Sequence, residues 1–146
     1  LMRTEKEWKI IELAPRMGGF RHEMYQLSYG INHILNDILV RVPQKPIIPK
    51  KTRGFTAVFN IYAKSEGLLV GVVGVKAVRA LASFNTVEVN KVKGDELKFA
   101  KNGGSPVMEI TLFNKLRSEL LADIRRMEKA VVIDVAKPAR RKSGSL

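Results

Sequence analysis

Three prolines within seven residues constrain this chain more than any other feature, because they exclude a helix at one place. The stretch VPQKPIIPKKTR, residues 42–53, contains Pro43, Pro46 and Pro49. Proline has no backbone N–H and clashes with the preceding helical turn, so clustered prolines favour an extended, semi-rigid connection. We therefore expect this stretch to join two differently folded parts of the chain.

A helix is predicted over residues 21–40, before the proline-rich connection. Leu27, Ile31 and Ile38 recur there at the spacing of one helix face. Gly30 weakens such a helix by about 1 kcal/mol relative to alanine and favours close packing against a neighbour. The first part of the chain is therefore expected to be helical.

Strands are predicted to dominate the chain after the connection, because apolar and polar residues alternate there. The turns between these runs favour antiparallel hairpins. Residues 76–85 are consistent with either a strand or a short helix. The predicted elements are a hairpin of strands 54–62 and 68–75, a second hairpin of strands 86–92 and 96–101, a strand at 106–113, and a helix at 117–131 capped by Asn114.

These elements predict an α+β fold, with a four- or five-stranded antiparallel sheet and two long helices packed against it. We expect a single domain over residues 1–136 and a flexible basic tail over residues 137–146. No apolar run approaches the roughly 18 residues that a membrane-spanning helix requires. The chain has no cysteine and no signal-peptide pattern, so a cytoplasmic location is expected.

The strand after the prolines begins like the octapeptide of RNA-recognition motifs and then departs from it. Arg53, Gly54 and Phe55 match that pattern, whereas Thr56 and Asn60 do not. In the octapeptide register the strand would have both a poor core face and a poor stacking face. Alternation instead favours burial of the apolar side chains on one face, and we reject the octapeptide. The buried face would consist of Phe55, Ala57, Phe59 and Ile61.

The excess positive charge of the chain is concentrated in two blocks. The formal net charge is +12. Residues 38–87 contain eight basic residues against Glu66 alone, and residues 135–146 contain four basic residues and no acid. A basic surface needed only for solubility would spread its charge evenly, so this concentration indicates a surface that binds an anion.

Aromatic residues interleave with the basic ones, as in proteins that bind single-stranded nucleic acid by stacking bases inside a positive groove. We therefore predict a non-catalytic protein that binds single-stranded DNA, or RNA, with little sequence preference. No cofactor and no metal are expected. The predicted contacts are Lys50, Lys51, Arg53, Lys64, Lys76, Arg79, Arg140 and Arg141 with phosphates, and Tyr25, Tyr29, Phe55 and Tyr62 with bases. Phe55 is included because a residue at the end of a strand near a basic cleft can be half-exposed.

Two other functions compete with this prediction. A structural component of a ribosome or virion would use the basic tail in the same way. A metal-dependent nuclease is suggested by Glu96 and Lys98, but such a site needs a carboxylate on the preceding strand, where Glu88 would be an unorthodox partner. His22 and His33 are too far apart to share a helix face as metal ligands. We find no enzyme chemistry in the sequence.

The layout of the chain resembles that of ThermoDBP-type proteins, the single-stranded DNA-binding proteins of thermophilic archaea that lack an OB-fold. The likeness lies in a helical first part, an antiparallel sheet, the absence of cysteine and a charged end, MEKAVVIDVAKPARRKSGSL. The resemblance implies that bases are held in an apolar cleft edged by basic residues. Such proteins dimerise through a C-terminal extension that this chain lacks, so a homodimer is left open.

Overall fold

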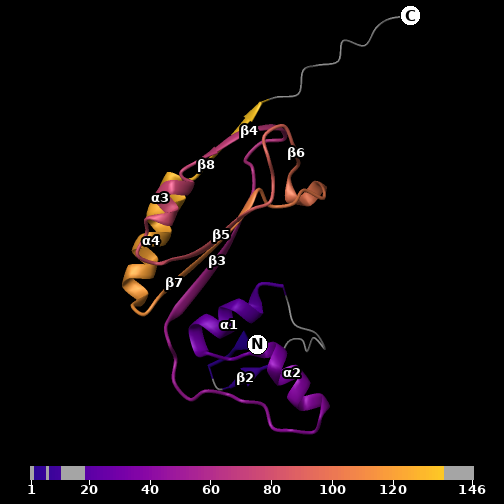
Figure 1. Cartoon of the computed structure of the whole chain (residues 1–146), viewed down its shortest axis with the longest axis vertical. Coiled ribbons are helices and arrows are strands. Elements are labelled where there is room, and N and C mark those ends of the chain that lie inside the picture. The colour runs from indigo at the N-terminus through magenta and orange to yellow at the C-terminus, as the bar shows by residue number, and fades with distance from the viewer. Residues whose placement is uncertain (1, 6, 11–18, 137–146) are drawn as a thin grey trace, which may run out of the picture.

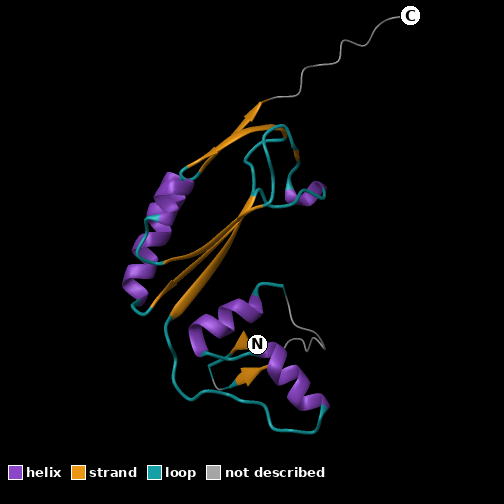
Figure 2. Ribbon diagram, viewed as in Figure 1, coloured by secondary structure: helices purple, strands orange, loops and turns teal. Residues whose placement is uncertain are grey.

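The structure is a computed structural model that describes residues 2–5, 7–10 and 19–136, and it confirms the α+β class (Figures 1 and 2). Its strands form two three-stranded antiparallel sheets and a two-stranded ribbon rather than one sheet. The predicted basic tail lies outside the described residues. The elements are β1 (Met2–Arg3), β2 (Trp8–Lys9), α1 (Arg21–Tyr29), α2 (His33–Arg41), β3 (Phe55–Ile61), β4 (Gly67–Val73), α3 (Val75–Arg79), β5 (Phe84–Val89), β6 (Glu96–Leu97), η1 (Ala100–Asn102), β7 (Met108–Asn114), α4 (Arg117–Ala130) and β8 (Val132–Ala136).

Both predicted hairpins are wrong, because the strands pair with partners distant in sequence. Strand β3 pairs along its whole length with β7, and β5 pairs with the other edge of β7. Strand β4 instead lies between β6 and β8 in the second sheet. The chain changes from one sheet to the other after each strand from β3 to β7. A second apolar cluster packs against β4 and β8 of the second sheet. That cluster consists of Ala63, Leu69, Leu97 and Val107.

The main core lies between the sheet β3–β7–β5 and the helices α3 and α4 (Figure 1). Ile110 and Leu112 of β7 are fully buried against Leu120 and Met127 of α4. The predicted alternation of β3 is confirmed, since Ala57, Phe59 and Ile61 pack against this core. Phe55, at the end of the strand, remains 42% exposed.

The helix predicted at 21–40 is divided into α1 and α2, so the prediction of a single helix is wrong. Gly30 ends α1 in a left-handed conformation, with φ of 72°, which costs a glycine little. Asn32 then starts α2, because its side-chain oxygen accepts a hydrogen bond from the backbone N–H of Leu35 at 2.9 Å. A C-cap glycine and an N-cap asparagine two residues apart therefore separate the helices.

Three elements after β3, namely α3, α4 and β8, also differ from or complete the prediction. The ambiguous stretch after β4 forms a short helix, α3. The helix predicted at 117–131 is present as α4, but its N-cap is Leu116, not Asn114. Asn114 instead accepts from the Leu116 N–H and donates to the Ser83 hydroxyl. Strand β8, which the sequence pattern did not predict, completes the second sheet.

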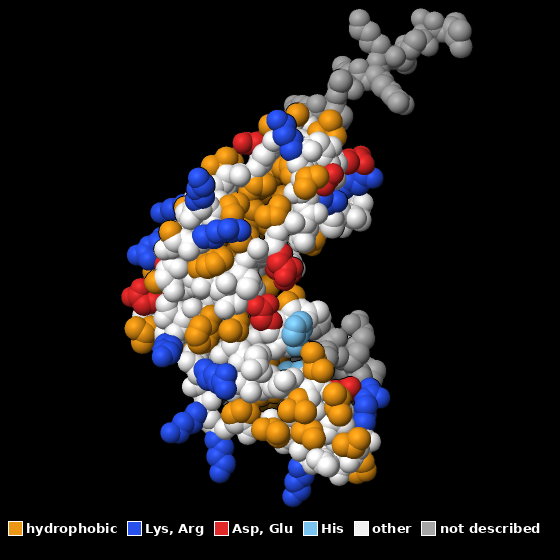
Figure 3. Space-filling model, in the orientation of Figure 1, with side chains coloured by type: hydrophobic (Ala, Val, Ile, Leu, Met, Phe, Trp, Pro, Cys, Tyr) orange, Lys and Arg blue, Asp and Glu red, His pale blue; other side chains and the backbone are white. Residues whose placement is uncertain are grey.

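The molecule is elongated, with the N-terminal helices at one end and the two sheets toward the other (Figure 1). The space-filling view is hollowed at the waist, between these parts, and acidic side chains lie on its sheet side (Figure 3). In the described part of the chain, every helix is too short or too polar to cross a membrane.

Candidate functional site

The sheet β3–β7–β5 has one face covered by α3 and α4, and a second face that we call the open face. Because side chains alternate along a strand, the residues that do not point into the main core point to this second face. Helix α1 packs against one end of it, where the Ser28 hydroxyl lies 2.7 Å from that of Thr56. The open face consists of Thr56, Val58, Asn60, Thr86, Glu88, Glu109, Thr111 and Phe113.

Two carboxylates lie next to each other on the open face. Glu88 of β5 and Glu109 of β7 are direct cross-strand partners, and Asn60 of β3 is the partner of Glu109 on its other side. Directly opposite residues of an antiparallel pair have Cβ atoms about 4.5–5.5 Å apart. One row across three strands therefore carries two carboxylates and an amide.

This carboxylate pair forms no ion pair and no side-chain hydrogen bond within the described residues. All four ion pairs found there use other acids, and neither Glu88 nor Glu109 takes part in a side-chain hydrogen bond. Like charges placed directly opposite each other destabilise a sheet. A bound cation would remove this repulsion, and oxygen ligands suit a hard cation such as Mg²⁺.

The donor set fits one kind of metal site and not another. The described residues contain no group of three or more His, Cys, Asp or Glu side chains that could hold a metal ion. A closed, all-protein cage is therefore not available there. Mg²⁺ is commonly held by one or two carboxylates and completed by waters and substrate phosphates. Glu88 and Glu109 match this open type of site.

A cavity of about 440 Å³ lies beside the open face, between α1 and the start of β3. Its walls include the aromatic rings of Tyr25, Tyr29 and Phe55, and the hydrogen-bonded pair of Ser28 and Thr56. The two tyrosine ring centroids are 5.9 Å apart. An aromatic cavity with a few convergent polar groups is typical of small-molecule sites.

The cavity and the carboxylates lie along the same strand face. Thr56, in the cavity wall, and Asn60, in the carboxylate row, are both on the open face of β3. The four steps along the strand from Thr56 to Asn60 correspond to about 13 Å at the rise of a β-strand. A single extended ligand could therefore contact both.

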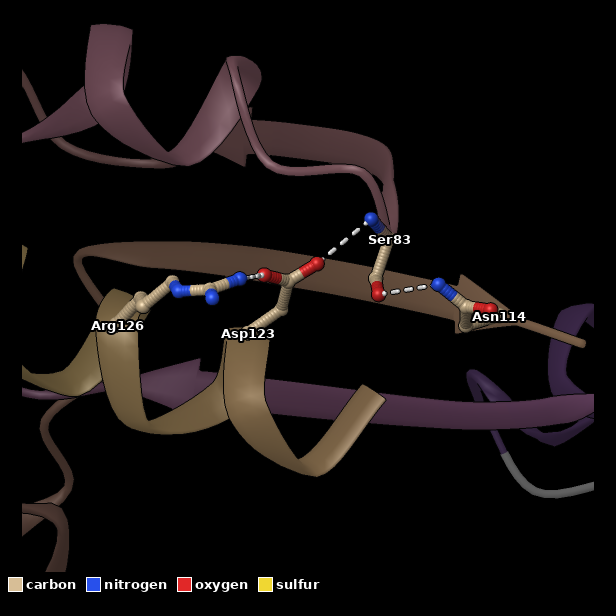
Figure 4. Close-up of polar contacts among 4 residues, drawn as sticks. All are labelled: Ser83, Asn114, Asp123 and Arg126. Carbon is tan, nitrogen blue, oxygen red and sulfur yellow. Dashed lines mark hydrogen bonds and ion pairs between the residues drawn. The ribbon is translucent and has the colours of Figure 1, made fainter. Parts of the chain in front are cut away.

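A hydrogen-bond network anchors the start of β5, the strand that carries Glu88 (Figure 4). The buried Asp123 carboxylate accepts from the Ser83 N–H at 2.9 Å and from Arg126 at 2.6 Å. Asn114 donates to the Ser83 hydroxyl at 3.0 Å. Burial alone would raise the pKa of Asp123, but the hydrogen bonds from Ser83 and Arg126 outweigh burial and lower it. The network ties β5, β7 and α4 together.

The residues predicted to bind nucleic acid are not gathered in one groove. Tyr25, Tyr29 and Phe55 do come together in the cavity wall. Lys76 and Arg79 lie on α3, which packs against the opposite face of the sheet. The others are distributed as follows: Lys50, Lys51 and Arg53 on the connection before β3, Tyr62 and Lys64 just after β3, and Arg140 and Arg141 outside the described residues.

Glu88 and Glu109 were not predicted from the sequence as a pair. Each lies among alternating apolar residues, in TVEVN and in VMEIT, so their polar side chains could have been assigned to a non-core face. The prediction pairs strand 86–92 with 96–101 in a hairpin and gives strand 106–113 no partner, so the pattern did not indicate that strands 86–92 and 106–113 are neighbours. The nuclease hypothesis depended on Glu96 instead. Glu96 lies in the other sheet, and its carboxylate forms an ion pair with Lys98 at 3.6 Å.

Comparisons with known proteins give a structural likeness without a sequence match. No family model matches the chain, and no curated protein matches it in sequence. An L-amino acid ligase from Bacillus licheniformis has a TM-score of 0.63 at 15% identity, over 80% of this chain and 30% of the ligase. N5-carboxyaminoimidazole ribonucleotide synthetase from Thermotoga maritima has a TM-score of 0.57 at 13% identity, over 84% of this chain and 32% of the synthetase.

A third similar structure is phosphoribosylglycinamide synthetase from Anaerococcus prevotii, with a TM-score of 0.56 at 13% identity, over 80% of this chain and 30% of the synthetase. All three are ligases of the ATP-grasp fold. At these identities the likeness concerns the fold alone. The chain spans about a third of the length of each protein.

These neighbours overturn the function predicted from the sequence. A non-catalytic protein that binds single-stranded nucleic acid is wrong, as are its assembly and nuclease alternatives, because the fold is shared with ATP-grasp ligases. The prediction that the chain has no enzymatic role is wrong for the same reason. No comparison tests the resemblance to ThermoDBP-type proteins or the homodimer, which stay predictions.

Proposed function

We propose that this chain forms the metal- and nucleotide-binding part of an ATP-dependent ligase. The observation that carries the proposal is the Glu88–Glu109 pair, two carboxylates in cross-strand register on the open face that form no ion pair with any described residue. The likeness of the fold to ATP-grasp ligases supports this assignment and names the class of ligand.

In this proposal each described group has a distinct role. Glu88 and Glu109 hold Mg²⁺, Asn60 offers its amide oxygen from the neighbouring strand, and the phosphates of the nucleotide supply further ligands. When bound, the ion neutralises the charge of the phosphates. The aromatic cavity takes the base, which stacks on Tyr25 or Phe55.

The proposal is limited to binding of the metal and the nucleotide, since the chain spans about a third of the similar ligases. The groups that select the other substrates would lie elsewhere in the complete enzyme. We also propose a cytoplasmic location, because the chain contains no cysteine that could form a structural disulfide.

Isothermal titration calorimetry with ATP in the presence of Mg²⁺ tests the proposal. We expect Glu88→Gln and Glu109→Gln each to weaken binding of the Mg²⁺–ATP complex by about tenfold or more, equal to about 1.4 kcal/mol. Glu119→Gln is the matched control, because Glu119 is an exposed acid on α4, away from the open face. It should leave binding unchanged.

The dependence of ATP binding on Mg²⁺ distinguishes a specific metal–nucleotide site from nonspecific attraction between a basic protein and a polyphosphate. We expect EDTA to abolish the difference between the wild type and Glu109→Gln. No detectable binding of the wild type at millimolar Mg²⁺–ATP, or equal loss in Glu119→Gln, would contradict the proposal.

A further inference from the structure

Unlike α1, α3 and α4, helix α2 buries none of its residues. An amphipathic helix of a folded protein normally turns its apolar stripe to a core. On α2 this stripe faces outward, with Ile34 and Ile38 56% and 52% exposed. Leu35 and the C-cap residue Val42 continue the same stripe. The helix therefore presents an apolar surface that nothing in the described chain covers.

The proline-rich connection adds a second apolar ridge beside α2. The Asn36 side chain donates to the Ile47 carbonyl at 3.0 Å and accepts from the Ile47 N–H at 2.8 Å. This double hydrogen bond ties the extended segment to the helix and leaves Ile47 and Ile48 exposed. The prolines on both sides stiffen the segment, so the ridge is held in place before any partner arrives.

We call the combined surface the apolar patch. Hydrophobic side chains gather at this end of the molecule in Figure 3. Scattered exposed apolar residues are normal on a protein, whereas a contiguous group with a charged border marks an interaction surface. The apolar patch consists of Ile34, Leu35, Ile38, Val42, Ile47 and Ile48.

The border of the apolar patch is basic. No acidic residue occurs between Asp37 and Glu66, and Asp37 is engaged by Arg41 at 2.9 Å. In the part of the chain that the structure describes, Lys45, Lys50 and Lys51 form no ion pair. Blue side chains project around the apolar end of the molecule in Figure 3. A complementary partner must therefore carry negative charge around an apolar centre.

We infer that the apolar patch docks an amphipathic helix of another protein, one with an apolar face flanked by acidic side chains. The exposed apolar side chains of α2 and of the 47–48 ridge suit an apolar helix face, and the basic border suits acidic flanks. A second copy of this chain is a poor occupant, because it would bring two basic borders together. This inference stands independently of the proposed nucleotide site.

Fluorescence anisotropy with a designed peptide tests the inference. The probe is a labelled helical peptide with leucines at positions i, i+3, i+4 and i+7 and glutamates on both flanks. The control peptide has lysines in place of the glutamates. We expect the acidic peptide to bind in a salt-dependent manner, and the basic peptide to bind about tenfold more weakly or not at all.

Two sets of variants assign the binding to the apolar patch. The double variant Ile38→Ser/Ile48→Ser removes two apolar side chains from the centre of the apolar patch. The double variant Lys45→Glu/Lys50→Glu reverses the charge of two residues in its basic border. Each should weaken binding of the acidic peptide about tenfold. Val92→Ser is the matched control, because Val92 is an exposed apolar residue at the other end of the molecule, and should have no effect. Circular dichroism verifies that every variant is folded.

Three results would overturn the inference. The first is an absence of binding by the acidic peptide, and the second is binding that Ile38→Ser/Ile48→Ser does not weaken. The third is a concentration-dependent dimer in sedimentation analysis that Ile38→Ser/Ile48→Ser abolishes, since a second copy would then occupy the apolar patch.

Discussion

The two faces of the sheet β3–β7–β5 are built from the same strands but differ in burial and in the polarity of their side chains. On the covered face, Ile110 and Leu112 are fully buried beneath α3 and α4. On the open face, the neighbouring residue Glu109 lies beside Glu88, and neither forms an ion pair with a described residue. Side-chain alternation thus separates the buried core from the proposed binding surface along a single strand, β7. Substitutions on the two faces of this sheet should therefore have opposite effects on stability.

The largest expected effect is on the covered face. Ile110→Ala should lower the free energy of unfolding by about 2–5 kcal/mol, because it leaves a cavity in a fully buried cluster. Urea denaturation followed by circular dichroism measures this loss. A loss below about 1 kcal/mol would mean that the covered face is not the stabilising one.

Asp123 tests how firmly the covered face holds β5. Asp123→Ala should cost about 1–3 kcal/mol, because the Ser83 N–H loses its buried acceptor and Arg126 loses its partner. Asp123→Asn retains an acceptor oxygen and should cost less. Both values come from the same denaturation experiment, and equal losses in the two variants would show that packing, not hydrogen bonding, is responsible.

The contribution of Asp123 should also depend on pH. Its folded-state pKa is lowered, so the carboxylate stabilises the fold above its unfolded pKa of about 3.9. This stability is lost as the pH falls below that value through the folded pKa. The difference in stability between the wild type and Asp123→Asn should therefore be constant near neutral pH and shrink below about pH 4. A constant difference down to pH 2 would contradict this.

A smaller effect of opposite sign is expected on the open face. In the absence of divalent cations, Glu88→Gln should raise the free energy of unfolding by about 0.2–1 kcal/mol, because it removes the repulsion from Glu109. Saturating Mg²⁺ should stabilise the wild type but not the variant. Thermal unfolding with EDTA and with Mg²⁺ measures both. Destabilisation of Glu88→Gln in EDTA would show that the pair is not a repulsive one.

The smallest effect is expected on α2, which extends the comparison to helices. Ile38→Ala should change stability by less than about 0.5 kcal/mol, because its side chain faces solvent. Leu120→Ala on α4 should cost about 2 kcal/mol or more, because Leu120 belongs to the main core. Similar losses at the two positions would mean that α2 is packed against another surface in solution.

The elements themselves were largely predictable, because they depend on local patterns. The strand at β3, the strand at β7 and the helix at α4 all follow from the spacing of apolar residues. The division of the first helix was not predicted, because Gly30 was taken as a weak position and not as a C-cap. The hairpins were wrong because alternation gives the faces of a strand but not its neighbours.

By itself, the sequence determined which residues of β5 and β7 turn away from the core. TVEVN and VMEIT each place a glutamate between apolar neighbours, and the two-residue period of a strand assigns it to the polar face. Only the tertiary structure decided that these two glutamates are cross-strand partners. Pairing and register depend on contacts between segments distant in the chain, which no local pattern encodes.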